Sequence, residues 1–270
     1  MGRLISMNLF RMRKSKMFWV SAIIFFVVGI LLPIIIKITA NVLYEIVKNS
    51  NDAQSVMEAK ELVELNNQPA AFSGVLRAMF GGAGPMLILA LVCAASFMFA
   101  DLGHGYIKNI AGRFPNKWVL AFPKYLVAMI QSVIFVLVSI LGTIVGLLAT
   151  RGIEFDRFIP EALLEFLVKL LLLCAMVSIV FFFTVGLRNK GLGIVMGVFM
   201  GTSALYVITL PLQLIINSVL KIDFKFEDYI PDYQFQLTDI NLTRNVIISL
   251  VCIAIFLPSA LALSNSQDVK

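Results

Sequence analysis

Six long apolar stretches, joined by shorter polar segments, dominate the pattern of side chains along this chain. The hydrocarbon core of a bilayer is about 30 Å thick and is crossed by roughly 20 apolar residues in helical form, a length that each stretch reaches. The pattern therefore predicts an all-α polytopic membrane protein whose residues 1–270 form a single transmembrane domain. The expected spans are 17–36, 81–100, 125–150, 162–187, 191–220 and 246–264.

Composition and charge agree with this prediction. Hydrophobic residues make up 60% of the 270 residues, more than the single core of a soluble domain of this length would bury. Acidic residues gather in 45–64, 154–165 and 223–239, and basic residues occupy the alternate polar segments. By the positive-inside rule, the basic segments and both termini lie in the cytoplasm. The net charge of +6 is thus a topology signal, and no nucleic-acid partner is expected. The basic residues concerned are Arg3, Arg11, Arg13, Lys14, Lys16, Lys108, Arg113, Lys117, Lys124, Arg188 and Lys190.

The N-terminal arm, residues 1–16, has the pattern of a helix that lies in the headgroup plane beside anionic lipid. At 100° per residue, three apolar side chains share one face and three basic side chains lie roughly opposite. The alternative is that these charges only set the topology. The two faces are Ile5, Leu9 and Met12 against Arg3, Arg11 and Lys14.

The connection between the second and third spans holds a short amphipathic pattern. Ile107, Ile110, Ala111 and Phe114 recur at helical spacing, and Pro115 ends the run. A helix over 106–114 is therefore expected, with Lys108 and Arg113 beside its apolar stripe. Such a helix suits docking into a groove on a soluble partner, and the alternative is a helix that rests on the lipid surface.

The run from Phe99 to Arg113 reads FADLGHGYIKNIAGR, and Lys124 follows as the next span begins. It resembles the first cytoplasmic loop of type-2 ABC transporter permeases, in which a basic elbow helix precedes six spans and this loop forms the coupling helix. The order of elements along this chain looks the same from end to end. The similarity is closest to bacterial permeases that export peptides, namely lantibiotic-immunity transporters and phenol-soluble-modulin exporters.

This resemblance implies a membrane subunit of an ATP-driven exporter in a bacterial plasma membrane. Its partners would be two copies of an ABC ATPase, a second permease subunit, identical or paralogous, and membrane lipids. ATP and Mg would bind to the ATPase, and this chain would hold no cofactor. The implied cargo is an amphipathic peptide or a lipid-like molecule, exported by alternating access. Short exit helices could occupy 221–243. The ATPase-docking residues would be Tyr106, Ile107, Lys108, Ile110, Arg113 and Phe114.

Glycines at four-residue spacing occur in two of the expected spans. Small residues at this spacing let membrane helices approach closely. Packing within one protomer is the favoured use, and packing between protomers is the alternative. The glycines are Gly142 and Gly146 in the third span, and Gly193, Gly197 and Gly201 in the fifth.

The fifth span also carries a polar stripe on a face roughly opposite its glycines. An uncharged span that keeps five hydrogen-bonding side chains on one face is not expected to show that face to lipid. The stripe either lines a transport pathway or bonds to neighbouring helices, and Pro211 predicts a kink nearby. Its members are Thr202, Tyr206, Thr209, Gln213 and Asn217.

The charges within the fourth span, Glu165 and Lys169, stand four residues apart and can pair on one helical face. Structural pairing or snorkelling is favoured there over a proton relay. His104 is the only histidine, so no His-based metal site or catalytic triad is expected, and the chain is not predicted to be an enzyme. Two other functions remain open: an ATP-independent ion-coupled carrier or channel, and a non-transporting membrane scaffold or sensor.

Overall fold

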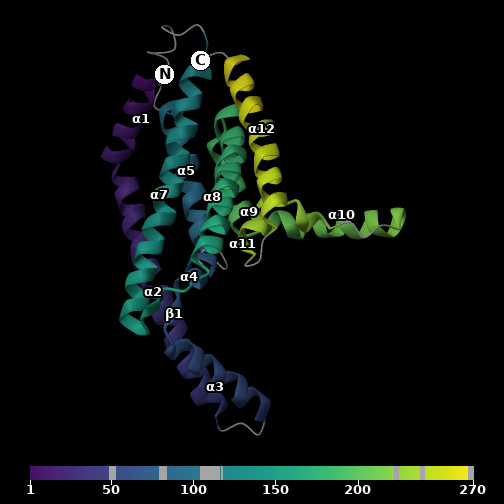
Figure 1. The fold of residues 1–270 in the computed structure, drawn as a ribbon. Coiled ribbons are helices and arrows are strands. Elements are labelled where there is room, and N and C mark those ends of the chain that lie inside the picture. Colours follow the sequence, from purple (N-terminus) through teal and green to yellow (C-terminus); the bar gives the residue numbers. More distant parts are fainter. Residues whose placement is uncertain are drawn as a thin grey trace. The chain divides into compact units, whose positions relative to one another are not determined.

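The computed structural model describes residues 1–48, 53–78, 84–103, 116, 118–221, 225–237 and 241–266, and these are almost entirely helical (Figure 1). Contacts between Cα atoms divide the chain into two compact units. Unit 1 comprises Met1–Ser21, Phe80–Ile134 and Glu165–Lys270, and unit 2 comprises Ala22–Met79 and Phe135–Leu164.

Among the described residues, four helical segments are long and apolar enough to cross a membrane. They are α2 (Lys16–Val47), α7 (Trp118–Thr150), α8 (Ile159–Phe181) with its π-helical continuation η1 (Phe182–Gly186), and α12 (Leu242–Ser266). A bent pair of helices, α9 and α10, makes a fifth if it counts as one span. In α5 (Gly84–Gly103), the apolar part Met86–Ala100 is shorter than a crossing. These lengths and compositions indicate an all-α, membrane-embedded protein.

The fifth expected span, 191–220, is not one continuous helix. It consists of α9 (Lys190–Gly201) and α10 (Ala204–Leu220), which are bent by 73°. The break follows from Gly201, Thr202 and Ser203, three poor helix formers in a row. The Thr202 hydroxyl donates to the carbonyl oxygen of Val198 at 2.9 Å, and Ser203 takes a left-handed conformation with φ of 52°. The bend therefore lies at residues 202–203. Pro211 lies inside α10, where the expected kink stays a prediction.

Within unit 2, α2 and α7 approach closely along their glycines. A Cβ atom on Gly146 would lie 2.5 Å from the carbonyl oxygen of Ile30, and Gly142 lies against the backbone of Phe26. The opposing helix contributes Gly29, where a Cβ atom would lie 2.6 Å from the carbonyl oxygen of Ser139. Contact at this distance allows many favourable van der Waals interactions, which hold membrane helices together in the absence of a hydrophobic drive.

The polar part of unit 2 contains α3 (Ala53–Asn67), β1 (Ala70–Ala71), α4 (Phe72–Ala78) and β2 (Ile153–Glu154). The two short strands pair in parallel. The Asp156 carboxylate accepts hydrogen bonds from the Ser73 hydroxyl and backbone N–H, and Arg151 Nη1 donates to the carbonyl oxygen of Leu65 at 3.1 Å. These bonds tie the segment after α2 to the segment after α7.

Unit 1 begins with α1 (Gly2–Lys14), a helix over most of the expected 1–16 arm, in which Met12 is buried. Its centre is the packing of α5 against α9 and of α9 against η1. Gly201 lies against Ile88, Gly197 against Leu91 and Gly193 against the side chain of Thr184. The surrounding core consists of fully buried apolar residues, including Leu91, Ala94, Met98, Leu172 and Met176.

Replacing Gly146 with valine should separate α2 from α7, because the added side chain meets the Ile30 carbonyl oxygen. Overpacking of this kind costs about 1–3 kcal/mol, so thermal unfolding in detergent should occur at a clearly lower temperature. The matched control is Val145→Ile on the same helix, whose side chain is exposed and which should leave the Tm unchanged. Equal Tm values for Gly146→Val and the wild type would contradict the close contact.

Candidate functional site

The residues expected to dock on an ATPase lie outside the described residues. Tyr106, Ile107, Lys108, Ile110, Arg113 and Phe114 all fall between the end of α5 and the start of α7. Their role therefore stays a prediction, and the site that the structure does describe is the polar stripe of the fifth span.

Four stripe residues lie on the more buried side of α10. Tyr206, Thr209, Gln213 and Asn217 are half-buried, whereas large apolar neighbours such as Val207 and Leu212 are exposed. The fifth stripe residue, Thr202, lies at the break between α9 and α10. Helical periodicity thus identified one face of α10, but the bend separates that face from the glycine face of α9.

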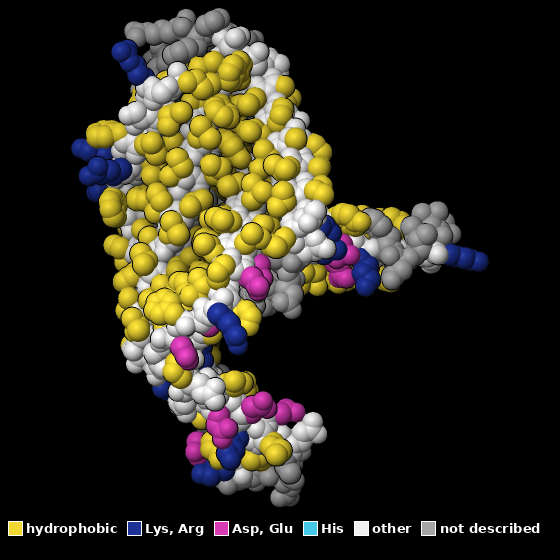
Figure 2. Space-filling model, in the orientation of Figure 1, with side chains coloured by type: hydrophobic (Ala, Val, Ile, Leu, Met, Phe, Trp, Pro, Cys, Tyr) yellow, Lys and Arg dark blue, Asp and Glu magenta, His cyan; other side chains and the backbone are white. Residues whose placement is uncertain are grey.

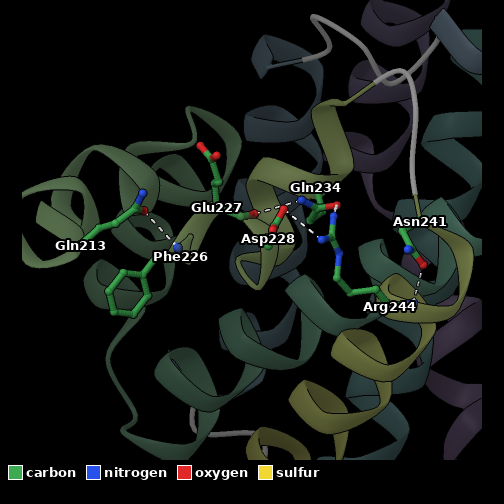
Figure 3. Close-up of polar contacts among 7 residues, drawn as sticks. All are labelled: Gln213, Phe226, Glu227, Asp228, Gln234, Asn241 and Arg244. Atoms are coloured by element: carbon green, nitrogen blue, oxygen red, sulfur yellow. Dashed lines mark hydrogen bonds and ion pairs between the residues drawn. The ribbon is translucent and has the colours of Figure 1, made fainter. Parts of the chain in front are cut away.

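A segment that follows α10 in the sequence covers its polar side. We define the cover as residues 225–237, which include the 3₁₀ turn η2 (Phe226–Asp228) and α11 (Pro231–Gln236). Gln213 Oε1 accepts a hydrogen bond from the Phe226 backbone N–H at 3.0 Å (Figure 3). The Tyr206 ring stacks on Tyr233, with ring centroids 4.6 Å apart. Gln213 and Tyr206 therefore have a structural role, because they bind the cover. A pathway role for the stripe stays a prediction.

Polar contacts also form within the cover and between the cover and the start of α12 (Figure 3). Gln234 Nε2 donates to the carbonyl oxygen of Glu227 at 3.0 Å, and Arg244 forms an ion pair with Asp228 at 3.0 Å. Asn241 Oδ1 accepts from the Arg244 backbone N–H at 3.1 Å and so satisfies an amide in the first turn of α12. Because the ion pair is about a third exposed, it contributes at most about 1 kcal/mol.

Lys169 connects the end of the cover to α8. Its side chain is only 1% exposed, and its Nζ donates to the carbonyl oxygen of Leu237 at 2.7 Å. The sequence predicts Glu165 as a partner on the same helical face, and that pairing stays a prediction. The partner that the structure gives is the Leu237 carbonyl oxygen, 68 positions away. Burying a lysine in a membrane helix costs free energy unless its amino group has a hydrogen-bond partner. Because the cover supplies that partner, we infer that the cover stays docked in the folded protein.

Asp232, in the first turn of α11, is fully buried, and neither carboxylate oxygen accepts a hydrogen bond of ordinary geometry from the described residues. Burial raises the pKa of this carboxyl from 3.8 to about 7, and the nearby backbone amides of Asp232 and Tyr233 lower it by less. The cover therefore contains a carboxyl group that changes charge near neutral pH.

Between α10 and α12, the arrangement offers hydrogen-bonding groups, a pair of stacked rings and the buried carboxyl of Asp232 in α11. Among the described residues, no group of three or more His, Cys, Asp or Glu side chains could hold a metal ion. No family model matches this chain, and no similar protein is found among curated proteins or solved structures. Function must therefore be inferred from the residues themselves.

Sequence reasoning did not identify the cover. It allowed short helices within 221–243, and η2 and α11 are such helices. Two local signals point to them: Pro231, which suits the first turn of a helix, and Asp232 in the same turn. The residues of α8 and α10 that bind the cover could not be paired with it from the sequence, because tertiary contacts between distant segments determine those pairs.

The docking of the cover should depend on pH through Asp232. The folded chain holds this proton more tightly than the unfolded chain, so unfolding releases a proton between about pH 4 and 7, and stability falls as the pH rises through that range. Amide hydrogen exchange of residues 225–237 should therefore be at least several-fold faster at pH 8 than at pH 5.5, after correction for intrinsic exchange.

Asp232→Asn should abolish this difference, whereas the control Asp228→Asn, at a partly exposed carboxyl, should retain it. A wild-type cover equally protected at both pH values would contradict the role of Asp232.

Proposed function

We propose that this chain is the permease subunit of an ATP-driven ABC exporter that moves amphipathic peptides or lipid-like molecules out of the cytoplasm. The observation that carries this proposal is the run from Phe99 to Arg113, with its amphipathic stripe between two apolar helices and its resemblance to a coupling loop. The membrane-embedded, all-α architecture is compatible with such a subunit.

In this proposal, two ATPase subunits bind ATP and Mg below two permease subunits, which are identical or paralogous. Both termini would face the cytoplasm of a bacterial cell, because the positive-inside rule places the basic segments on that side. The chain contributes the elbow helix, the docking helix over 106–114 and the membrane spans, and ATP hydrolysis takes place on the partner.

A mechanical route for coupling follows from the contacts within unit 1. Movement of the loop 104–117 would act on the end of α5 and the start of α7. Because α5 packs directly on the glycines of α9, a shift of α5 must move α9. The short break at Thr202–Ser203 then transmits that movement to α10 and its cover. Closure of the ATPases would in this way alter the outer end of unit 1.

The polar stripe of α10 supports an amphipathic cargo over a small ion. Its side chains are uncharged hydrogen-bonding groups, and apart from Ser218 the rest of the helix is apolar. A small ion would need a ring of charged or carbonyl ligands to replace its hydration shell. The absence of charge from the stripe therefore favours an amphipathic cargo over a small ion.

One observation favours a second candidate, an ion-coupled carrier. Broken helices mark the substrate sites of many such carriers, and α9 and α10 form a broken pair. The two candidates differ in their need for an ATPase. A carrier would transport in proteoliposomes that contain this chain alone and an ion gradient, whereas the exporter requires the ATPase and ATP.

Docking of the loop on an ATPase is tested by truncating its apolar stripe. The double variant Ile110→Ala and Phe114→Ala should lose most of the co-purifying ATPase and the ATP hydrolysis stimulated by cargo, because it removes much of the buried apolar surface. Lys108→Glu should weaken binding in a salt-dependent way. The control Asn109→Ala changes a polar residue outside the stripe and should bind normally.

Wild-type binding and coupling in the double variant would rule out docking through this stripe. Co-purification of no ATPase with the unmodified chain would count against the exporter itself.

A further inference from the structure

The exposed side of α10 forms an apolar face opposite the polar stripe. At 100° per residue, its large exposed side chains fall within an arc of roughly 160°, centred opposite Tyr206, Thr209, Gln213 and Asn217. The members of this apolar face are Val207 (65% exposed), Ile208 (55%), Leu212 (52%), Leu214 (63%) and Ile215 (58%).

The two sides of α10 therefore meet different surroundings. The polar side carries the cover, through the Gln213–Phe226 hydrogen bond and the Tyr206–Tyr233 stack. In Figure 2, hydrophobic side chains gather along the upper edge of this helix, and charged side chains lie below it. The cover itself is charged near its start: Glu227 and Asp228 belong to η2, and Lys225 directly precedes it.

The direction and depth of α10 follow from α9. Helix α9 has 12 residues and rises about 18 Å, which is less than the hydrocarbon thickness of about 30 Å. A helix that starts at the basic, cytoplasmic end and rises this far ends inside the opposite leaflet. From there α10 departs at 73°, much closer to the plane of the membrane than to the direction of α9 (Figure 1).

We propose that α10 is an in-plane helix that embeds its apolar face in the outer leaflet, with phospholipid acyl chains as its partner. The cover then shields the polar stripe on the side toward the headgroups. Lipid is the occupant that fits, because α10 is joined by two residues to a helix within the bilayer and its exposed arc carries no charge. Backbone and side-chain polar groups at this depth need internal partners, and the cover supplies them for Gln213. This inference goes beyond the proposed transport function; it rests on the proposed orientation, in which the basic segments are cytoplasmic, and does not depend on transport.

The test is a nitroxide scan of residues 204–218 in the full chain, with Cys93, Cys174 and Cys252 replaced by alanine. Each variant is reconstituted in vesicles of zwitterionic and anionic phospholipid, and accessibility to oxygen and to a water-soluble nickel complex is measured by power saturation. The ratio of the two accessibilities should oscillate with a 3.6-residue period about a constant mean. Labels at Ile208, Leu212 and Ile215 should favour oxygen at least several-fold more than labels at Gln213 and Asn217.

A scan of 247–258 in α12 is the control, because a spanning helix gives a ratio that changes steadily with depth. Such a steady change along α10 would overturn the proposal and make α10 the outer half of a straight fifth span. High nickel accessibility on the apolar face would place it in water, and dipolar broadening between copies would show that a second chain covers it. Either result also overturns contact with lipid. A variant that fails to fold is recognised by its loss during size-exclusion chromatography, and the neighbouring positions still define the period.

Discussion

The close approach of α5 and α9 is the contact on which the rest of unit 1 depends. In lipid, helices gain little from burying apolar side chains, so association relies on how closely their surfaces fit. Gly193, Gly197 and Gly201 give α9 a smooth side, and α5 and η1 lie directly on it. The third of these glycines is also the last residue of α9, so the packed contact ends where the chain bends. The direction of α10, and hence the position of its polar and apolar sides, follows from this contact.

The bend in turn requires the cover. A helix that turns within the membrane exposes polar groups that lipid cannot satisfy. Thr202 satisfies part of this need within α9 through its hydroxyl, and Gln213 does so through its hydrogen bond to the cover. The ring of Tyr206 stacks on Tyr233 of the cover. Lys169 holds the far end of the cover through the Leu237 carbonyl. The buried carboxyl of Asp232 adds a pH-sensitive element, because its pKa of about 7 makes docking more favourable in acid.

Hydropathy predicted the helices whose residues are uniformly apolar, since length and composition define them; α2, α7, α8 and α12 lie where four of the spans were expected. It could not predict the bend at Thr202–Ser203, because hydropathy does not report the direction of a helix axis. The run of Gly201, Thr202 and Ser203 was the local signal for a break. Periodicity found the polar face of α10, but its partners in the cover come from tertiary contacts. Gly29 was missed because it stands alone in its helix, and the expected docking helix lies outside the described residues.

The central claim is that the α5–α9 contact carries movement from the cytoplasmic loop to the outer end of unit 1. The most direct measurement is cargo-stimulated ATP hydrolysis by the proposed complex with an ATPase, carrying Gly197→Leu, in which the added side chain meets Leu91 and Val92. We expect the ATPase to co-purify normally but its stimulation by cargo to fall at least tenfold, whereas Val195→Leu, at an exposed position of the same helix, should behave like the wild type. Full stimulation in a stably folded Gly197→Leu complex would contradict the claim.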